Sequence, residues 1–265
     1  MCATCGCGDD GAVIRMAGHD HPHPHEHDHP HPHEHGHPHE TISLEQKVLA
    51  KNDELAEQNR RWLAERRILA FNLTSSPGAG KTTLLERTVA ELTPRRRVAV
   101  IEGDQETMLD AERIRAAGAR AVQVNTGAGC HLDAAMVHRA LDTLDPQPDS
   151  LLFIENVGNL VCPALFDLGE ASKVVIISVT EGDDKPLKYP HMFAESSLAV
   201  INKVDLLPYV NFDLEACARH ARSVNRAIEI LPMSVINGDG LQEWYDWIGA
   251  QVPKLANSGN VTTIR

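Results

Sequence analysis

The glycine-rich turn at residues 75–83 constrains this chain more than any other feature. It lies between a short apolar run and an amphipathic stretch. In a phosphate-binding loop of this kind, glycines let backbone N–H groups converge on phosphates at the start of a helix. The lysine then reaches the β- and γ-phosphates, and a threonine hydroxyl joins Mg²⁺. The strict pattern has a glycine five positions before Gly80, where this chain has Ser75. A turn that binds nothing is the alternative, but it leaves the Gly-Lys-Thr order unexplained. We therefore predict nucleoside triphosphate binding by Gly78, Ala79, Gly80, Lys81, Thr82 and Thr83.

A second motif, Asn202 to Asp205, follows the apolar run 197–201 and resembles the base-reading motif of GTPases. A carboxylate at Asp205 can accept hydrogen bonds from both N1–H and the exocyclic amine of guanine, a pair of donors that adenine lacks on that edge. The resemblance implies that the stem of Lys203 packs on the base and that Asn202 braces neighbouring loops. A solvated turn is the alternative for an isolated Asn-Lys-x-Asp. We predict guanine, with Ser234 in a degraded form of the last base-contact loop.

Two further apolar runs end in acidic residues. Residues 98–101 lead to Asp104, and residues 151–154 lead to Glu155. Carboxylates at the C-terminal ends of parallel strands lie beside a phosphate loop, where Mg²⁺ needs oxygen ligands. We therefore predict that Thr82, Asp104 and Glu155 hold Mg²⁺, and that Lys81, Asp104 and Glu155 form the catalytic set. Residues 155–158 read Glu-x-x-Gly where many GTPases have Asp-x-x-Gly. By this resemblance, the N–H of Gly158 could donate to the γ-phosphate and so respond to whether that phosphate is present. No residue plainly occupies the water-orienting glutamine position of small GTPases, so fast intrinsic hydrolysis is not expected.

Three cysteines, Cys2, Cys5 and Cys7, lie close together near the amino terminus. A disulfide between residues this close is geometrically awkward, and nothing else in the sequence indicates an oxidising compartment. Three thiolates with a fourth donor, such as the α-amino group of Cys2 after removal of Met1, would make a compact site for a soft metal.

A histidine tract follows the three cysteines. It has no apolar periodicity, and its interleaved Pro, Asp, Glu and Gly residues argue against a packed core. We predict a disordered arm whose histidines are weak metal ligands; a solvated linker with incidental metal affinity is the alternative. The histidines of the tract are His19, His21, His23, His25, His27, His29, His31, His33, His35, His37 and His39.

A third group of soft donors falls between the nucleotide motifs. Cys130 and His131 are adjacent, and Cys162 comes only seven residues after Glu155. These three donors suit a transition metal, but a closed site would need water or a second subunit. Burial without any ligand is the ordinary alternative for a cysteine. The position of Cys162 just past the γ-phosphate-sensing loop favours a metal ligand.

Together these motifs resemble the HypB family, the nickel-incorporation GTPases of [NiFe]-hydrogenase maturation, over almost the whole chain. The resemblance implies a high-affinity nickel site at the three amino-terminal cysteines and a weaker nickel or zinc site at Cys130, His131 and Cys162. It also implies a homodimer promoted by GTP or metal. The partners that it implies are a HypA-like accessory protein and the hydrogenase large-subunit precursor.

The distribution of apolar residues predicts an α/β fold: a P-loop GTPase with a mostly parallel sheet flanked by helices, preceded by a disordered Cys/His-rich arm. Apolar runs near 68–73, 98–101, 151–154, 174–179 and 198–201 alternate with longer amphipathic stretches. A polar stretch with Val48, Leu55 and Trp62 at seven-residue spacing predicts a helix between arm and domain. The predicted boundaries are an arm at 1–40, a linking helix at 41–67, a GTPase domain at 68–252 and a tail at 253–265.

The function that we predict is a GTP-hydrolysing nickel metallochaperone in which hydrolysis to GDP and phosphate acts as a switch. A nickel-buffering protein with a vestigial GTPase is one alternative, and an accessory GTPase for urease or a cobalamin-dependent mutase is another. The formal net charge of −12 disfavours nucleic acid and anionic membranes as partners. No apolar run is long enough for a membrane span or a signal peptide, so we expect a cytoplasmic protein.

Overall fold

The computed structural model describes residues 38–104, 109–126 and 130–258. Its centre is a seven-stranded sheet in the order β3-β2-β4-β1-β5-β6-β7, and all six neighbouring pairs are parallel. The predicted α/β class is therefore confirmed, with a sheet that is parallel throughout. The strands are β1 (Leu69–Ser75), β2 (Val98–Asp104), β3 (Arg120–Asn125), β4 (Leu151–Glu155), β5 (Ser172–Ser178), β6 (Leu198–Asn202) and β7 (Glu229–Pro232).

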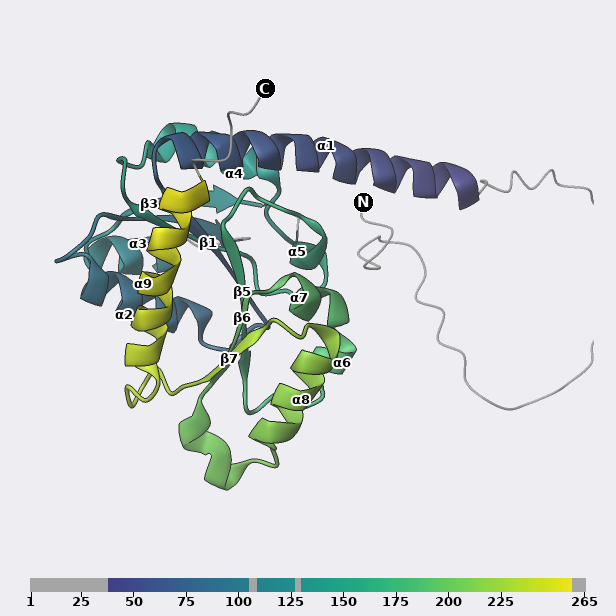
Figure 1. The fold of residues 1–265 in the computed structure, drawn as a ribbon, viewed down its shortest axis with the longest axis vertical. Helices are drawn as coiled ribbons and strands as arrows, with labels where there is room; N and C mark the ends of the chain where they lie inside the picture. Colours follow the sequence, from purple (N-terminus) through teal and green to yellow (C-terminus); the bar gives the residue numbers. More distant parts are fainter. Residues whose placement is uncertain (1–37, 105–108, 127–129, 259–265) are drawn as a thin grey trace, which may run out of the picture. The chain divides into compact units, whose positions relative to one another are not determined.

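Helices cover both faces of the sheet (Figure 1). The described helices are α1 (Pro38–Glu65), α2 (Lys81–Leu92), α3 (Leu109–Ala116), α4 (Ala134–Leu144), α5 (Cys162–Leu165), α6 (Lys185–Lys188), α7 (Pro190–Glu195), α8 (Leu214–Val224), α9 (Leu241–Ser258) and the 3₁₀ helix η1 (Val204–Tyr209). Among the described residues, none of these helices is both long and apolar enough to cross a bilayer.

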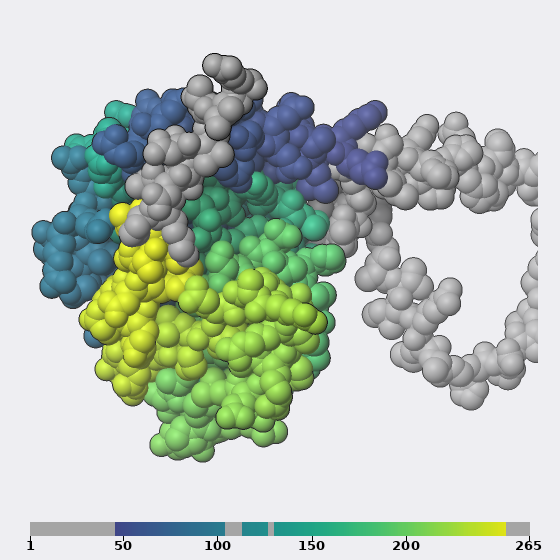
Figure 2. Space-filling view, viewed as in Figure 1, coloured from purple at the N-terminus to yellow at the C-terminus, as the bar shows by residue number. Residues whose placement is uncertain are grey.

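Alternation along the strands divides the core between the two faces. Phe71 and Leu73 point to a cluster shared with α2, α3 and α9, whereas Ala70 points to a cluster shared with α4 and the end of α1. A third cluster joins β5 and β6 to α7 and α8. In the space-filling view, α9 in yellow adjoins the yellow-green surface of the segment around α8 (Figure 2). The buried centre leaves the strand ends as the place for polar chemistry.

Helix α1 covers the predicted linking segment, but its buried face differs from the expected stripe. Val48 is half exposed, and Leu55 and Trp62 are only partly buried. The buried positions are instead Asn52, Ala56, Asn59 and Leu63, which recur every three or four residues. Two of them are asparagines, so an apolar pattern could not reveal this face.

Strand β3 lies at one edge of the sheet and was not among the predicted apolar runs. Its residues are partly or fully exposed, because only one neighbouring strand, β2, covers it. The division into an arm, a linker, a domain and a tail stays a prediction. Helix α9 continues past residue 252 to Ser258.

Candidate nucleotide and metal site

The phosphate loop connects β1 to α2 at the C-terminal end of the sheet. Gly78 and Gly80 have φ angles of 74° and 96°, in the left-handed region that favours glycine. A Cβ atom at Gly80 would also lie 2.4 Å from the Nδ2 atom of Asn202. Ser75 is the last residue of β1, an extended position that any residue can adopt. This explains why the loop tolerates serine where the strict pattern has glycine.

Glu155 lies directly against the loop. Its Oε1 atom accepts hydrogen bonds from Lys81 Nζ and Thr82 Oγ1, each at 2.6 Å. The Glu155 side chain is 3% exposed, and no described residue donates a hydrogen bond to its buried Oε2 atom. Because a buried carboxylate oxygen without a hydrogen bond is costly, Oε2 is suited to a cation. Glu155 and Thr82 therefore fit as ligands of Mg²⁺, and Asp104 ends the nearby strand β2.

The predicted base-reading motif begins at the end of β6. Asn202 donates from Nδ2 to the carbonyl of Ala79 at 2.8 Å, and its Oδ1 accepts from the backbone N–H of Val235 at 3.2 Å. It thus ties the phosphate loop to the loop after β7. Lys203 has a φ of 63° and donates from Nζ to the carbonyl of Gly78 at 2.7 Å.

Asp205 and Ser234 are also brought together. The Ser234 hydroxyl donates to Asp205 Oδ1 at 2.6 Å, and Ser234 is fully buried. This hydrogen bond fixes one carboxylate oxygen of Asp205 and orients the carboxylate. The contact supports a role for both residues in base recognition, which stays a prediction.

The loop after β4 runs from the phosphate loop to a group of soft donors. Gly158 packs against the phosphate loop, since a Cβ atom there would lie 3.3 Å from the Cα of Pro77. Asn159 donates from Nδ2 to the carbonyl of Cys130 at 3.3 Å, and the loop ends at Cys162, the first residue of α5. One short segment therefore contacts both the phosphate loop and Cys130.

Cys130, His131 and Cys162 converge, with all three ligand atoms within 4.8 Å of one another. The two sulfur atoms are 3.0 Å apart, and His131 Nδ1 is 3.6 Å from Cys130 Sγ. Burial lowers the pKa of His131, although Asp133 acts in the opposite direction. The lowered pKa favours the neutral imidazole, the form that coordinates a metal. The arrangement fits a nickel or zinc ion, whose ligand roles stay predictions.

Sequence reasoning missed two polar residues near the nucleotide site. Lys185, which follows β5, lies 3.2 Å from Glu181 and 3.5 Å from the hydroxyl of Ser76 in the phosphate loop. Glu102 is buried on β2 and pairs in register with Glu155, so both side chains point to the same face. Glu102 directly follows the apolar run 98–101, so the sequence could have indicated it as a polar residue at a strand end. No sequence pattern indicates Lys185. Cys2, Cys5, Cys7 and the histidine tract to His37 lie outside the described residues.

A parallel sheet with a glycine-rich loop between β1 and α2, and with a buried carboxylate at the end of β4 that contacts this loop, defines a P-loop domain of the GTPase class. Comparison with known proteins agrees with this class. Residues 69–232 match the CobW/HypB/UreG nucleotide-binding domain family. The chain is 58% identical over 210 residues to hydrogenase maturation factor HypB of Escherichia coli strain K12, covering 79% of this chain and 72% of that protein.

Two crystal structures are also similar. HypB from Archaeoglobus fulgidus superposes with a TM-score of 0.72 at 41% identity, covering 77% of this chain and 99% of that one. HypB from Helicobacter pylori in complex with nickel superposes with a TM-score of 0.73 at 35% identity, covering 81% and 100%. The chain belongs to the HypB family of hydrogenase maturation factors.

Proposed function

We propose that this protein is a GTP-hydrolysing nickel metallochaperone that delivers or stores Ni(II) for [NiFe]-hydrogenase maturation. The observation that carries the proposal is the cluster of Cys130, His131 and Cys162, which one loop joins to Glu155 in the nucleotide site. HypB of Helicobacter pylori has been solved with nickel, which supports nickel as the ion for this cluster; zinc is the competitor.

The nucleotide chemistry follows from the residues around the phosphate loop. Lys81 and the loop amides stabilise the charge that develops on the phosphates, and Thr82, Asp104 and Glu155 would hold Mg²⁺. Mg²⁺ supplies charge neutralisation between the phosphates. Lys81 now contacts Glu155, so phosphate binding must compete for its ammonium group. Hydrolysis then changes the contacts of the loop at Gly158, which makes it a switch.

A homodimer is the assembly that suits the metal cluster, because three donors per chain do not complete a tetrahedral site. GTP or metal would promote it. In this proposal Cys2, Cys5, Cys7 and the histidine tract form a separate nickel store, and a HypA-like protein and the hydrogenase large-subunit precursor receive the ion. The protein would act in the cytoplasm.

A complementation experiment tests the proposal. A strain that lacks this gene is given the wild type, Lys81→Ala or Cys162→Ala, and hydrogenase and urease activities are measured side by side at limiting nickel. We expect both variants to lose hydrogenase activity, with urease retained. A nickel buffer with a vestigial GTPase predicts instead that Lys81→Ala works as well as the wild type. Loss of urease activity with hydrogenase retained would indicate an accessory GTPase for urease.

The guanine assignment has its own test in Asp205→Asn. The amide would still accept the Ser234 hydrogen bond, but it leaves the N1–H and amine donors of guanine facing an N–H group. Each unpaired buried group costs about 1–3 kcal/mol, so GTP affinity should fall at least about tenfold. Xanthosine triphosphate, which has a carbonyl in place of the amine, should be relatively favoured.

Competition between fluorescent nucleotides and GTP, ATP or xanthosine triphosphate measures this change. Lys81→Ala is the control, since it should weaken every triphosphate without altering base preference. If Asp205→Asn keeps the wild-type preference for guanine, the Asn202–Asp205 motif is only a turn.

A further inference from the structure

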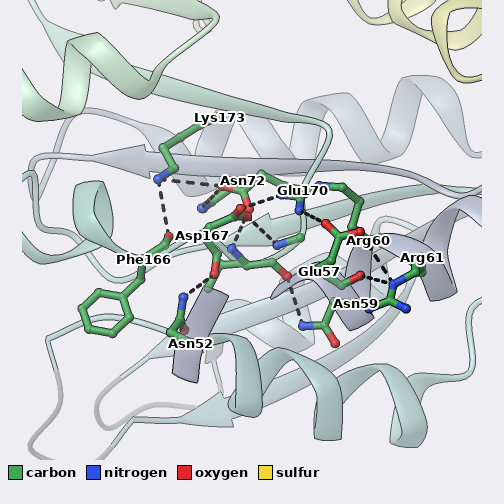
Figure 3. Close-up of polar contacts among 12 residues, drawn as sticks. Asn52, Glu57, Asn59, Arg60, Arg61, Asn72, Phe166, Asp167, Glu170 and Lys173 are labelled. Carbon is green, nitrogen blue, oxygen red and sulfur yellow. Dashed lines mark hydrogen bonds and ion pairs between the residues drawn. The ribbon is translucent and has the colours of Figure 1, made fainter. Parts of the chain in front are cut away.

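A chain of buried polar side chains crosses the sheet from one half of the metal cluster to the other. It contains Asn156, Asn72, Glu170 and Lys173, and all four are at least nine-tenths buried. Asn72, Glu170 and Lys173 are drawn with their contacts in Figure 3. None of the four is a predicted nucleotide or metal ligand. Burying polar groups is costly unless they are hydrogen-bonded or paired, so the contacts of these four side chains decide how they are tolerated.

The first end of the chain holds the segment that carries Cys130 and His131. Asn156 follows β4, and its Oδ1 accepts a hydrogen bond from the backbone N–H of Leu132, the residue after His131, at 3.1 Å. The same oxygen accepts from the N–H of Val157 at 3.0 Å. Asn156 therefore fixes the position of the first two metal donors relative to the loop after β4.

The middle of this row of polar side chains runs from Asn156 through Asn72 on β1 to Glu170, which lies just before β5. Asn156 donates from Nδ2 to Asn72 Oδ1 at 3.4 Å, and Asn72 donates from Nδ2 to Glu170 Oε1 at 2.9 Å. The second oxygen of Glu170 accepts from the N–H of Leu168 at 2.7 Å. Glu170 lies 3.8 Å from the Lys173 ammonium, its nearest positive charge among these contacts. Hydrogen bonds therefore link Asn156 to Asn72 and Asn72 to Glu170, and an ion pair links Glu170 to Lys173.

The second end holds the helix that carries Cys162. Lys173 donates from Nζ to the carbonyl of Pro163, within α5, at 2.9 Å and to that of Phe166, the residue after α5, at 3.4 Å. The ring of Phe166 in turn contacts His131, with centroids 4.1 Å apart. An apolar side chain at 173 could fill the space but could not hold these two carbonyls.

We propose that Lys173 is a positioning residue for the metal cluster, and that the chain from Asn156 to Lys173 sets the separation between Cys162 and the Cys130–His131 pair. The proposal rests on the metal site described under the proposed function. Hydrogen bonds that hold the residues carrying metal ligands orient those ligands, and their loss typically weakens metal binding about 10- to 100-fold.

The test uses the full-length protein with Cys2→Ser, Cys5→Ser and Cys7→Ser as the parent. The remaining thiols are Cys130, Cys162 and Cys217. Thiolate-to-nickel charge-transfer absorption during titration with Ni(II) alone then reports the cluster and is blind to the histidine tract. Nickel affinity comes from competition with a chelator.

Lys173→Met should weaken nickel binding about 10- to 100-fold and shift or diminish the charge-transfer band. Lys173→Arg keeps a donor, and a cavity of about 430 Å³ beside Lys173 gives it room, so it should restore the band. Lys173→Met combined with Glu170→Gln leaves no unpaired charge and should bind nickel as weakly as Lys173→Met. Val200→Ala, a core change on β6, is the control for general loss of stability.

Parent-like affinity and absorption in Lys173→Met and in the double variant would overturn the proposal, as would an equal loss in Val200→Ala. Cooperative urea unfolding confirms that each variant is folded. If the parent itself shows no charge-transfer band, the metal site fails and the positioning role fails with it. A band that is present in the parent and unchanged in the variants refutes the positioning role alone.

Discussion

At the scale of single residues, Gly78 and Gly80 share a left-handed backbone but differ in their surroundings. A Cβ atom at Gly78 would meet nothing within 4 Å, whereas one at Gly80 would displace the Asn202 amide. Alanine in this backbone region costs about 1–2 kcal/mol at either position. Gly80→Ala should additionally break the Asn202 contact with Ala79, and should therefore weaken GTP binding more than Gly78→Ala. Isothermal titration of both variants measures the difference; equal losses would assign the whole effect to backbone strain.

Cys217 illustrates a cysteine that is packed rather than a ligand. Burial first, and then Asp183 and Asp184, raise its pKa to about 12. The thiolate fraction at pH 8 is then on the order of one in ten thousand, so iodoacetamide should spare Cys217 and modify the partly exposed Cys130. The folded state holds this proton more tightly than the unfolded state. Its contribution to stability is therefore lost as the pH rises from about 9 toward about 12.

Peptide mapping after alkylation, in native buffer and in urea, measures this reactivity. Cys217→Ser should leave nickel binding unchanged. Alkylation of native Cys217 as fast as that of Cys130 would contradict the assignment.

The sequence predicts a residue's role where the motif is contiguous. It does not predict a contact between residues that are far apart in the sequence. The phosphate loop and the turn ending at Asp205 each carry their chemistry within a few positions. Lys185 meets Ser76 across 109 residues, and Asn72 meets Glu170 across 98. No local pattern encodes such pairs, because only the parallel strand order brings them together.

At the scale of elements, buried asparagines anchor α1. Asn59 is fully buried, donates to the carbonyls of Ala134 and Leu168 at 2.9 and 3.1 Å, and lies 2.9 Å from His138 Nδ1. Asn59→Ala should lower the free energy of unfolding by about 2–4 kcal/mol, because it leaves several buried polar groups without a hydrogen-bond partner. Gln58→Ala, at an exposed position of the same helix, should change it by less than about 0.5 kcal/mol.

Urea denaturation of the two variants provides the measurement. Similar small effects would show that α1 is held by its apolar contacts alone.

The central strands of the sheet could be predicted because they are continuous apolar runs, as in Ile176 and Ile177 of β5, both fully buried. Edge strand β3 could not, since its partial exposure removes the apolar signal. Helix α1 was predicted to exist but not to turn its asparagines inward. Propensity and periodicity report an element, whereas hydrogen bonding decides which face it buries.

At the scale of the whole molecule, the loop after β4 connects the phosphate loop to the three soft donors Cys130, His131 and Cys162. Glu155 contacts Lys81 and Thr82 at the start of this loop, and Gly158 packs on the phosphate loop. Cys162, at the end of the loop, lies beside Cys130 and His131. Because these contacts lie within one short segment, we expect a shift of this loop caused by the γ-phosphate to change the position of Cys162.

Nickel affinity should therefore depend on the bound nucleotide. We expect the affinities with GDP and with a non-hydrolysable GTP analogue to differ by about 5- to 150-fold, the range of typical coupling energies of about 1–3 kcal/mol. Linkage requires nickel to change the affinity difference between the two nucleotides by the same factor, which gives an independent check. The measurement uses the full chain with Cys2, Cys5 and Cys7 changed to serine, and follows thiolate-to-nickel absorption. Cys162→Ala serves as the control that should abolish the dependence. Equal nickel affinities in both nucleotide states would remove the switch from the mechanism, even with GTP hydrolysis and nickel binding each intact.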